Sequence, residues 1–253
     1  MIKTNSDISI FSYQEIDSTN DESKRLLDNQ KMPPYWVIAD KQTAGRGRKN
    51  RFWDSPSGNF MGTYVLNISG KKRILPQLSF VSALAIYDTI IEFKPKNSSA
   101  IIMLKWPNDI IINDKKCGGI LIENIFSENN LLHTIAIGIG VNLSNSPLHT
   151  TFPSGNVLKE LNIDIKRDTF LTAINNNILK LLTIWNTGKN YKEILSSWKS
   201  VAYLINKEIL VSLPNGDKQA GIFSSIDDEG GLVLLNNKGK KDIFYAAEIF
   251  EGL

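Results

Sequence analysis

Residues 8–14 alternate hydrophobic and polar side chains with a period of two, which is the pattern of a β-strand with one buried face. We also expect strands at the compact apolar segment 35–39 and at residues 60–68. Between residues 75 and 93, and again between 170 and 185, apolar side chains recur every three or four positions, as on one face of a helix. The amino-terminal part of the chain is therefore predicted to mix strands with helices.

The middle of the chain is predicted to contribute further strands. Apolar runs at residues 101–104, 110–112, 120–126 and 131–141 alternate with short polar segments, and residues 113–116 have the composition of a hairpin tip. Strands joined by such short connections pair antiparallel. Together with the helices they predict an α+β fold, in which helices pack against a mixed, mainly antiparallel sheet.

Beyond about residue 205 the texture changes to short strands separated by turns rich in Gly, Asn and Asp. The predicted strands lie at residues 209–213, 220–226, 232–235 and 243–245. This spacing is typical of a small β-barrel. We therefore expect a main domain over residues 1–205 and a small barrel over residues 206–253, which is near the lower size limit for a domain that folds alone.

Composition narrows the class of protein. With 253 residues, 42% hydrophobic and 22% charged, the chain is neither disordered nor fibrous. One Cys excludes an intrachain disulfide or a Cys-built metal site, and two His make a His-rich metal centre improbable. No segment approaches the roughly 18 apolar residues of a membrane span, and the first residues lack a signal peptide's apolar core. We therefore expect a cytoplasmic protein, and its net charge of +3 is too small to argue for nucleic-acid binding.

The first unusual segment is Gln-Thr-Ala-Gly-Arg-Gly-Arg-Lys-Asn-Arg-Phe-Trp, at residues 42–53. It is neither a dinucleotide-binding fingerprint nor a P-loop. Gly45 and Gly47 let the backbone turn and approach a ligand closely. The cationic residues of this segment are Arg46, Arg48, Lys49 and Arg51. The segment is therefore either an anion-binding loop or a solvated basic loop, and composition alone leaves both open.

Two further strings stand out. Residues 105–109 read Lys-Trp-Pro-Asn-Asp, where the proline forbids normal strand pairing and sets a lysine and a carboxylate on either side of a bend. Residues 116–123 read Lys-Cys-Gly-Gly-Ile-Leu-Ile-Glu, and a glycine pair weakens a strand unless something approaches its backbone. Taken singly, they could be a proline turn with a surface ion pair and a glycine bulge.

Together with Ser-Thr-Asn at residues 18–20, and in this order and spacing, these strings resemble the biotin protein ligase family. The resemblance covers nearly the whole chain. It implies a class II synthetase or biotin ligase-like catalytic domain with an SH3-like carboxy-terminal barrel. It also implies an ATP-dependent enzyme that activates biotin as biotinyl-AMP and transfers it to a lysine of a biotin carboxyl carrier protein, releasing AMP and pyrophosphate.

Matching by position, the resemblance implies overlapping groups of site residues. Biotin contacts are expected from Ser18, Thr19, Asn20, Gln42, Arg46, Gly47, Arg48 and Lys116. Nucleotide contacts are expected from Arg48, Trp53, Lys105, Asn108, Lys116 and Asn142, with residues 152–159 as a loosely matched nucleotide-side stretch. Catalytic roles fall to Lys116, Arg48 and Asp109.

Elementary chemistry agrees with this assignment. A carboxylate that attacks the α-phosphate of ATP brings two anionic groups together, which requires fixed cations such as Arg46, Arg48 and Lys116. Mg²⁺ is expected to arrive with ATP, near Asp109, with no metal site fixed by the protein. Transfer to a lysine amine needs no enzyme nucleophile. The expected partner is the carrier, without nucleic acid or membrane; a homodimer is left open.

Two other functions stay under consideration. A lipoate ligase or octanoyltransferase of the same fold would carry three consecutive glycines after arginines, and this chain lacks them. A non-enzymatic nucleic-acid-binding protein could use the basic loop, although no helix with clustered Lys and Arg accompanies it. Because the first strand is expected from residue 8, we expect no amino-terminal winged helix and a ligase without repressor activity.

Overall fold

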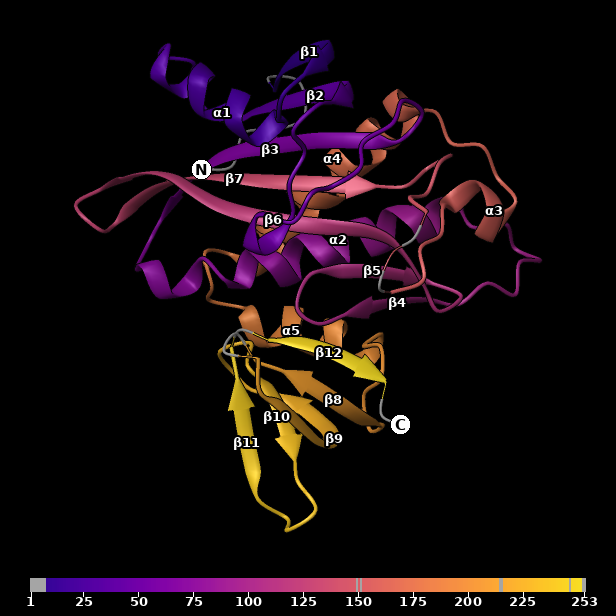
Figure 1. Cartoon of the computed structure of the whole chain (residues 1–253). Coiled ribbons are helices and arrows are strands. Elements are labelled where there is room, and N and C mark those ends of the chain that lie inside the picture. The colour runs from indigo at the N-terminus through magenta and orange to yellow at the C-terminus, as the bar shows by residue number, and fades with distance from the viewer. Residues whose placement is uncertain (1–7, 149, 151, 214–215, 246, 252–253) are drawn as a thin grey trace.

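A computed structural model describes residues 8–148, 150, 152–213, 216–245 and 247–251, arranged as helices around two sheets (Figure 1). The larger sheet has seven strands in the order β1-β2-β3-β7-β6-β5-β4. Their bounds are β1 (Ser9–Ile16), β2 (Tyr35–Gln42), β3 (Phe60–Ser69), β4 (Ile102–Lys105), β5 (Asp109–Ile112), β6 (Lys115–Glu128) and β7 (Leu132–Val141). β1 runs parallel to β2 and the remaining pairs are antiparallel, so the predicted mixed, mainly antiparallel sheet is confirmed.

Helices cover the sheet and supply most of its core. They are α1 (Thr19–Asp28), α2 (Gln77–Phe93), α3 (Val157–Leu161), α4 (Arg167–Trp185) and α5 (Tyr191–Ser200), with short 3-10 turns at Arg48–Asn50 and Lys72–Ile74. In Figure 1, α2 and α4 lie together behind the larger sheet. Apolar side chains of both helices join those of the sheet in one large core. This arrangement leaves the strand ends and loops of the sheet to build a site.

The segment Lys72–Phe93 is, by length and composition, apolar enough to cross a membrane, with a mean hydropathy of 1.5. In the fold, however, 61% of that stretch is buried, mainly against α4 and the sheet. A helix that is apolar on most sides is what a core position between a sheet and other helices requires. It therefore serves as a core helix here.

The smaller sheet contains five antiparallel strands in the order β11-β10-β9-β8-β12. Their bounds are β8 (Glu208–Ser212), β9 (Lys218–Ile226), β10 (Leu232–Leu235), β11 (Lys241–Phe244) and β12 (Glu248–Glu251). The arrangement is consistent with an SH3-like fold. Among the described residues β11 and β12 remain edge strands, so no closed barrel is formed. Sequence patterning missed β12, which follows β11 after only a short connection.

The two sheets are joined by backbone pairing and by a buried side chain. Leu104 of β4 accepts from the backbone of Tyr203 at 2.8 Å and donates to Val201 at 2.9 Å, so the chain leaving α5 pairs with the edge of the larger sheet. The indole N–H of Trp106 donates to the carbonyl of Gly230, in the turn before β10, at 3.0 Å. Trp106 is 2% exposed, so this bond lies inside the junction.

The hairpin between β5 and β6 is tighter than the sequence suggested. Asn113 and Asp114 form the turn with φ of 48° and 60°, the left-handed pair that a two-residue hairpin favours. β6 therefore begins at Lys115, five positions before the expected strand. As a result Lys116 lies within strand β6, rather than at the expected hairpin tip.

Candidate active site

A cavity of about 870 Å³ lies between the larger sheet, its loops and strand β12. Every residue that the resemblance assigned individually to substrate binding or catalysis lines it, whereas the loosely matched stretch 152–159 contributes only Phe152 and Ser154. The individually assigned residues are Ser18, Thr19, Asn20, Gln42, Arg46, Gly47, Arg48, Trp53, Lys105, Asn108, Asp109, Lys116 and Asn142. Segments distant in sequence thus meet at one site. Their individual roles remain predictions.

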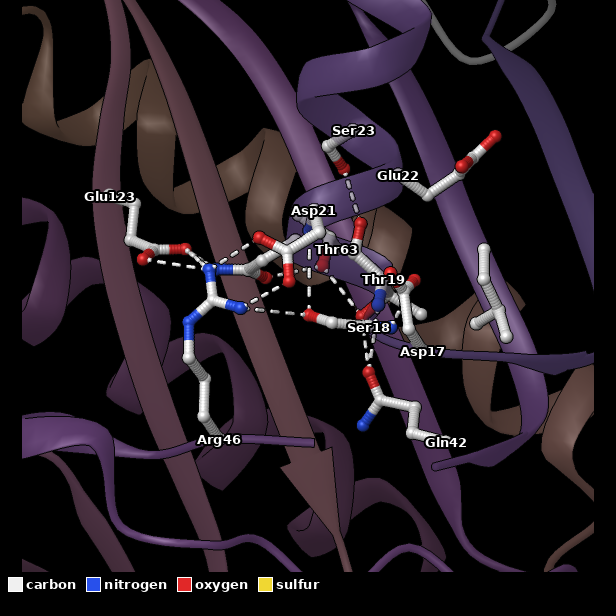
Figure 2. Close-up of polar contacts among 12 residues, drawn as sticks. Asp17, Ser18, Thr19, Asp21, Glu22, Ser23, Gln42, Arg46, Thr63 and Glu123 are labelled. Atoms are coloured by element: carbon white, nitrogen blue, oxygen red, sulfur yellow. Dashed lines mark hydrogen bonds and ion pairs between the residues drawn. The ribbon is translucent and has the colours of Figure 1, made fainter. Parts of the chain in front are cut away.

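One wall of the cavity, here called the polar wall, consists of Ser18, Thr19, Asn20 and Gln42. Figure 2 labels Ser18, Thr19 and Gln42. Ser18 is the N-cap of α1, since its hydroxyl accepts from a backbone N–H in the first turn. The Gln42 carbonyl accepts from the backbone and the hydroxyl of Thr19 at 2.8 and 3.0 Å. Because Ser18, Thr19 and Asn20 are at most 5% exposed, these polar groups are held in place before any ligand arrives.

Glycines on β6 and β7 make room for large side chains that face the cavity. The Trp53 ring lies so close to Gly140 that a Cβ there would come within 2.6 Å of it, and a Cβ on Gly119 would come within 3.2 Å. The carboxamide of Asn20 lies over Gly138 in the same way. The glycine pair noted in the sequence is thus explained at Gly119 by the close approach of Trp53.

Lys116 and Asp109 face each other on neighbouring strands. The ammonium of Lys116 lies 2.7 Å from a carboxylate oxygen of Asp109, and 5.5 Å from the centre of the Trp53 ring. Their side chains are 30% and 17% exposed, so this pair is only partly screened by water. A guanidinium N–H of Arg48 donates to the side-chain amide oxygen of Asn108 at 3.4 Å. Burial lowers the pKa of Arg48, and the Asp109 carboxylate opposes that shift.

Lys105 is the most buried cation of the cavity, with 7% of the residue exposed. Its ammonium lies 3.9 Å from the centre of the Phe152 ring and 5.6 Å from that of Phe250, in cation–π geometry. Burial lowers the pKa of Lys105 to about 8, while the Asp109 carboxylate works against the shift. An incoming anion would strongly stabilise the charged form of a lysine that is this well shielded from water.

Carboxylates bind most cations of the loop at residues 45–51, of which Arg46 and Arg48 were expected to contact the substrates. Arg46 pairs with Asp21 of α1 and Glu123 of β6, as Figure 2 shows. Lys49 and Arg51 both contact Glu248 of β12, at 3.1 and 2.6 Å. Arg48 differs, because no carboxylate of the described chain lies within ion-pair distance of it. These carboxylate partners were missed, since each comes from another element and nothing near the loop indicates them.

The segment between β7 and α3 forms another wall, contributing Pro147, Leu148, Thr150, Phe152 and Ser154. Backbone bonds tie it to β6: Lys116 donates to the carbonyl of Pro153 at 2.7 Å and accepts from Gly155 at 3.0 Å. The Asn142 amide donates to the Gly155 carbonyl at 3.0 Å. Asn142, expected at the nucleotide, therefore uses one donor to fix this wall.

Comparison with known proteins assigns the chain by sequence. Residues 12–142 match the model of the biotin/lipoate A/B protein ligase family, and residues 204–251 match that of the biotin protein ligase C-terminal domain. The biotin–[acetyl-CoA-carboxylase] ligase of Paracoccus denitrificans is 34% identical, over 93% of this chain and 98% of the relative. The bifunctional ligase/repressor BirA of Bacillus subtilis is 31% identical, over 94% of this chain and 72% of its own length.

Solved structures agree on the fold. The biotin protein ligase from Aquifex aeolicus in complex with biotin and ATP superposes with a TM-score of 0.80 at 24% identity, covering 96% of this chain and 99% of that one. The biotin protein ligase from Leishmania major in complex with biotinyl-5-AMP gives 0.67 at 24% identity, over 94% and 99%. With a sequence relative matched over nearly its full length, the chain belongs to the biotin protein ligase family.

Proposed function

We propose that the chain is an ATP-dependent ligase that activates biotin as biotinyl-AMP and transfers it to a lysine of a biotin carrier protein. The observation that carries this proposal is the cavity, which joins a buried polar wall to a group of cations. The polar wall offers fixed donors and acceptors to the uncharged ureido head of biotin. The cations Arg48, Lys105 and Lys116 line the cavity and would bind the carboxylate of biotin and the phosphates of ATP.

In the first step a carboxylate oxygen of biotin attacks the α-phosphorus of ATP. A new P–O bond forms, the bond from that phosphorus to the β-phosphate oxygen breaks, and pyrophosphate leaves. Negative charge concentrates on the phosphoryl oxygens, and Lys116 and Arg48 stabilise it from the fixed positions described above. The ion pair with Asp109 holds the Lys116 ammonium in place at the wall of the cavity.

In the second step the carrier's lysine amine attacks the acyl carbon of biotinyl-AMP. An amide forms, the acyl–phosphate bond breaks, AMP leaves and the amine loses a proton. Asp109 is 17% exposed and faces the cavity, so we assign proton acceptance to it. No covalent enzyme intermediate is required, which agrees with Cys117 being buried with a pKa raised by desolvation to about 12.

Mg²⁺ fits this site as a companion of ATP. Among the described residues no group of three or more His, Cys, Asp or Glu could hold a metal ion. Asp109 lies against Lys116 and lines the cavity, so it is the protein ligand that we expect, the rest coming from phosphates and water. Bound there, Mg²⁺ would neutralise phosphate charge.

The finer parts of the proposal concern partner, compartment and domain boundary. We propose a biotin carboxyl carrier domain as acceptor and the cytoplasm as location, and the single free thiol agrees with a reducing compartment. We also keep a boundary near residue 205 as a proposal. Support comes from β8, which starts the smaller sheet at Glu208.

Pyrophosphate exchange into ATP tests the proposed function. We expect exchange with biotin, and little with lipoate, octanoate or no acid, followed by labelling of a purified carrier domain. Lys116→Met should reduce exchange by about ten- to a hundredfold, the effect of one charge-assisted contact in a partly dry site. Lys115→Met is the matched control, because Lys115 pairs with Glu160 and does not line the cavity.

Several outcomes would contradict the proposal. Exchange that responds to lipoate or octanoate and ignores biotin would assign the chain to the rival acyl ligases. A salt-sensitive band shift with nucleic acid, in the absence of any exchange, would favour the binding protein. Equal losses in Lys116→Met and Lys115→Met would remove Lys116 from the reaction.

A further inference from the structure

Arg46 occupies an unusual position for a residue expected to bind a substrate anion. Its guanidinium contacts both carboxylate oxygens of Asp21, one of them at 2.8 Å, and both oxygens of Glu123 at 3.1 Å. It also lies 3.5 Å from the hydroxyl of Ser18. These bonds use both terminal nitrogens of the guanidinium. The pKa of Arg46 is raised, chiefly by the hydrogen bond to Asp21, so its charge is permanent.

The partner of Arg46 leads directly to the polar wall. Glu123 accepts from the side-chain amide of Asn20 at 2.5 Å, while the Asn20 carbonyl accepts from the hydroxyl of Thr63 at 2.6 Å. Asn20 is 5% exposed and Thr63 is fully buried. A chain of hydrogen bonds therefore runs from the loop through β6 and α1 to β3. Figure 2 labels Arg46, Glu123 and Thr63 of this chain.

This chain fixes which way the Asn20 amide points. A carboxylate only accepts hydrogen bonds, so Glu123 must face the amide NH₂, and the carbonyl must then face Thr63. One N–H of the NH₂ group remains for the cavity that Asn20 lines. Without Arg46, Glu123 and Asp21 would stand as two unbalanced carboxylates, and Glu123 could turn away from Asn20.

We infer that Arg46 is a positioning residue for the uncharged head of biotin, acting through Glu123 on Asn20, and that it does not bind the carboxylate or the phosphates. The inference rests on the proposed function and reassigns one residue within it. Its reason is geometric: the Arg46 guanidinium donates to two protein carboxylates and a hydroxyl. Arg48 instead contacts an amide oxygen of Asn108, and Lys116 contacts Asp109.

Steady-state pyrophosphate exchange on the full chain tests this inference, with the KM for biotin and for ATP measured separately. We expect Arg46→Met to raise the KM for biotin at least about tenfold while the KM for ATP changes less than about twofold, since one charge-assisted contact acts on that scale. The KM for biotin of Arg46→Lys should lie between those of the wild type and Arg46→Met, because a lysine can reach only one carboxylate at a time.

A double-mutant cycle with Asn20→Ala distinguishes positioning from direct binding. If Arg46 acts through Asn20, the double variant binds biotin about as weakly as Asn20→Ala alone. If the double variant instead loses biotin affinity by the product of the two single-variant losses, the inference is overturned. A larger effect of Arg46→Met on the KM for ATP than on that for biotin would also overturn it.

Arg25→Met serves as the matched control. Arg25 also bridges two carboxylates of the same region, Asp17 and Glu22, but does not line the cavity. Its biotin KM should stay unchanged, and thermal melting of every variant checks folding. Absence of biotin-dependent exchange in the wild-type chain would instead contradict the proposed function, and calorimetric titration with biotin would then still decide the role of Arg46.

Discussion

Lys105 illustrates how burial sets the charge of a single side chain. It is the last residue of strand β4 and precedes a buried tryptophan, so its stem lies inside the fold while its ammonium contacts two aromatic rings. Lys116 adds like charge, and the carboxylates of Asp109 and Glu248 only partly compensate. With a pKa near 8, Lys105 loses its proton within a range of pH in which ordinary lysines stay charged.

We predict that this titration affects ATP binding. Phosphates favour the protonated form, so affinity for a non-hydrolysable ATP analogue should weaken as pH rises through about 8, and binding near that pH should take up protons. Lys105→Met should bind the analogue about tenfold more weakly at lower pH and lose this dependence. Calorimetry in buffers of different ionisation enthalpy measures both effects, with Lys115→Met as control.

The sign for stability is opposite to that for binding. The folded pKa lies below the ordinary value of 10.5, so the protonated form costs the folded state free energy. In the free protein, this group's contribution to stability should therefore rise between about pH 8 and 10.5. If the free energy of unfolding of Lys105→Met depends on pH in the same way as that of the wild type, the lowered pKa of Lys105 is contradicted.

At the scale of elements, the loop at residues 45–51 is held at both ends by carboxylates of other elements. Arg46 ties it to α1 and β6, and Lys49 and Arg51 tie it to β12. The contacts of Lys49 and Arg51 are exposed, with side chains 43% and 65% accessible, so each is weak and salt-sensitive. This arrangement suits a loop that opens to admit ligands and closes over a reactive adenylate.

Limited trypsin digestion tests this arrangement, because the loop contains several cleavage sites. We expect cutting in the free protein, strong protection with biotin plus ATP, and weaker protection with biotin alone. Glu248→Gln should speed cleavage after Lys49 and Arg51 by about two- to fivefold, since exposed ion pairs contribute up to about 1 kcal/mol each. Glu208→Gln, on the neighbouring strand β8, should leave the rate unchanged. Identical cleavage in both variants would show that the β12 contact does not hold the loop.

Sequence patterning predicted the larger sheet and its main helices, because these depend on local periodicity. The residues that line the cavity were instead implied by the resemblance of contiguous motifs to a known family. Strand β12 is only four residues long, and helix α3 has five, so neither has enough periods to stand out. The partners Asp21, Glu123 and Glu248 were missed for another reason. Ordinary acidic residues become site residues only when tertiary packing brings them to the loop.

For the whole molecule, the bond between Trp106 and Gly230 joins the catalytic sheet to the smaller one. We predict that Trp106→Phe lowers the melting temperature by roughly 2–8 °C, because it leaves a buried carbonyl without its donor at a cost of about 1–2 kcal/mol. Differential scanning calorimetry measures the shift.

Trp198→Phe provides the matched control for that measurement. Trp198 is fully buried, and its indole N–H has no hydrogen-bond partner among the described residues. The same replacement there exchanges an indole for a smaller phenyl ring without breaking a hydrogen bond. Its loss should be smaller than that of Trp106→Phe. Equal shifts would mean that ring packing, and not the bond to Gly230, accounts for the effect.

The contact of Glu248 with Lys49 also bears on how the protein is made. The two residues are 199 positions apart, yet they meet at the mouth of one cavity. A ribosome releases Lys49 long before Glu248, so a nascent chain acquires its polar wall and its cations while the β12 wall does not yet exist. The cavity becomes complete only after synthesis has passed β12, and a polypeptide that stops earlier carries substrate-binding residues without the strand that encloses them.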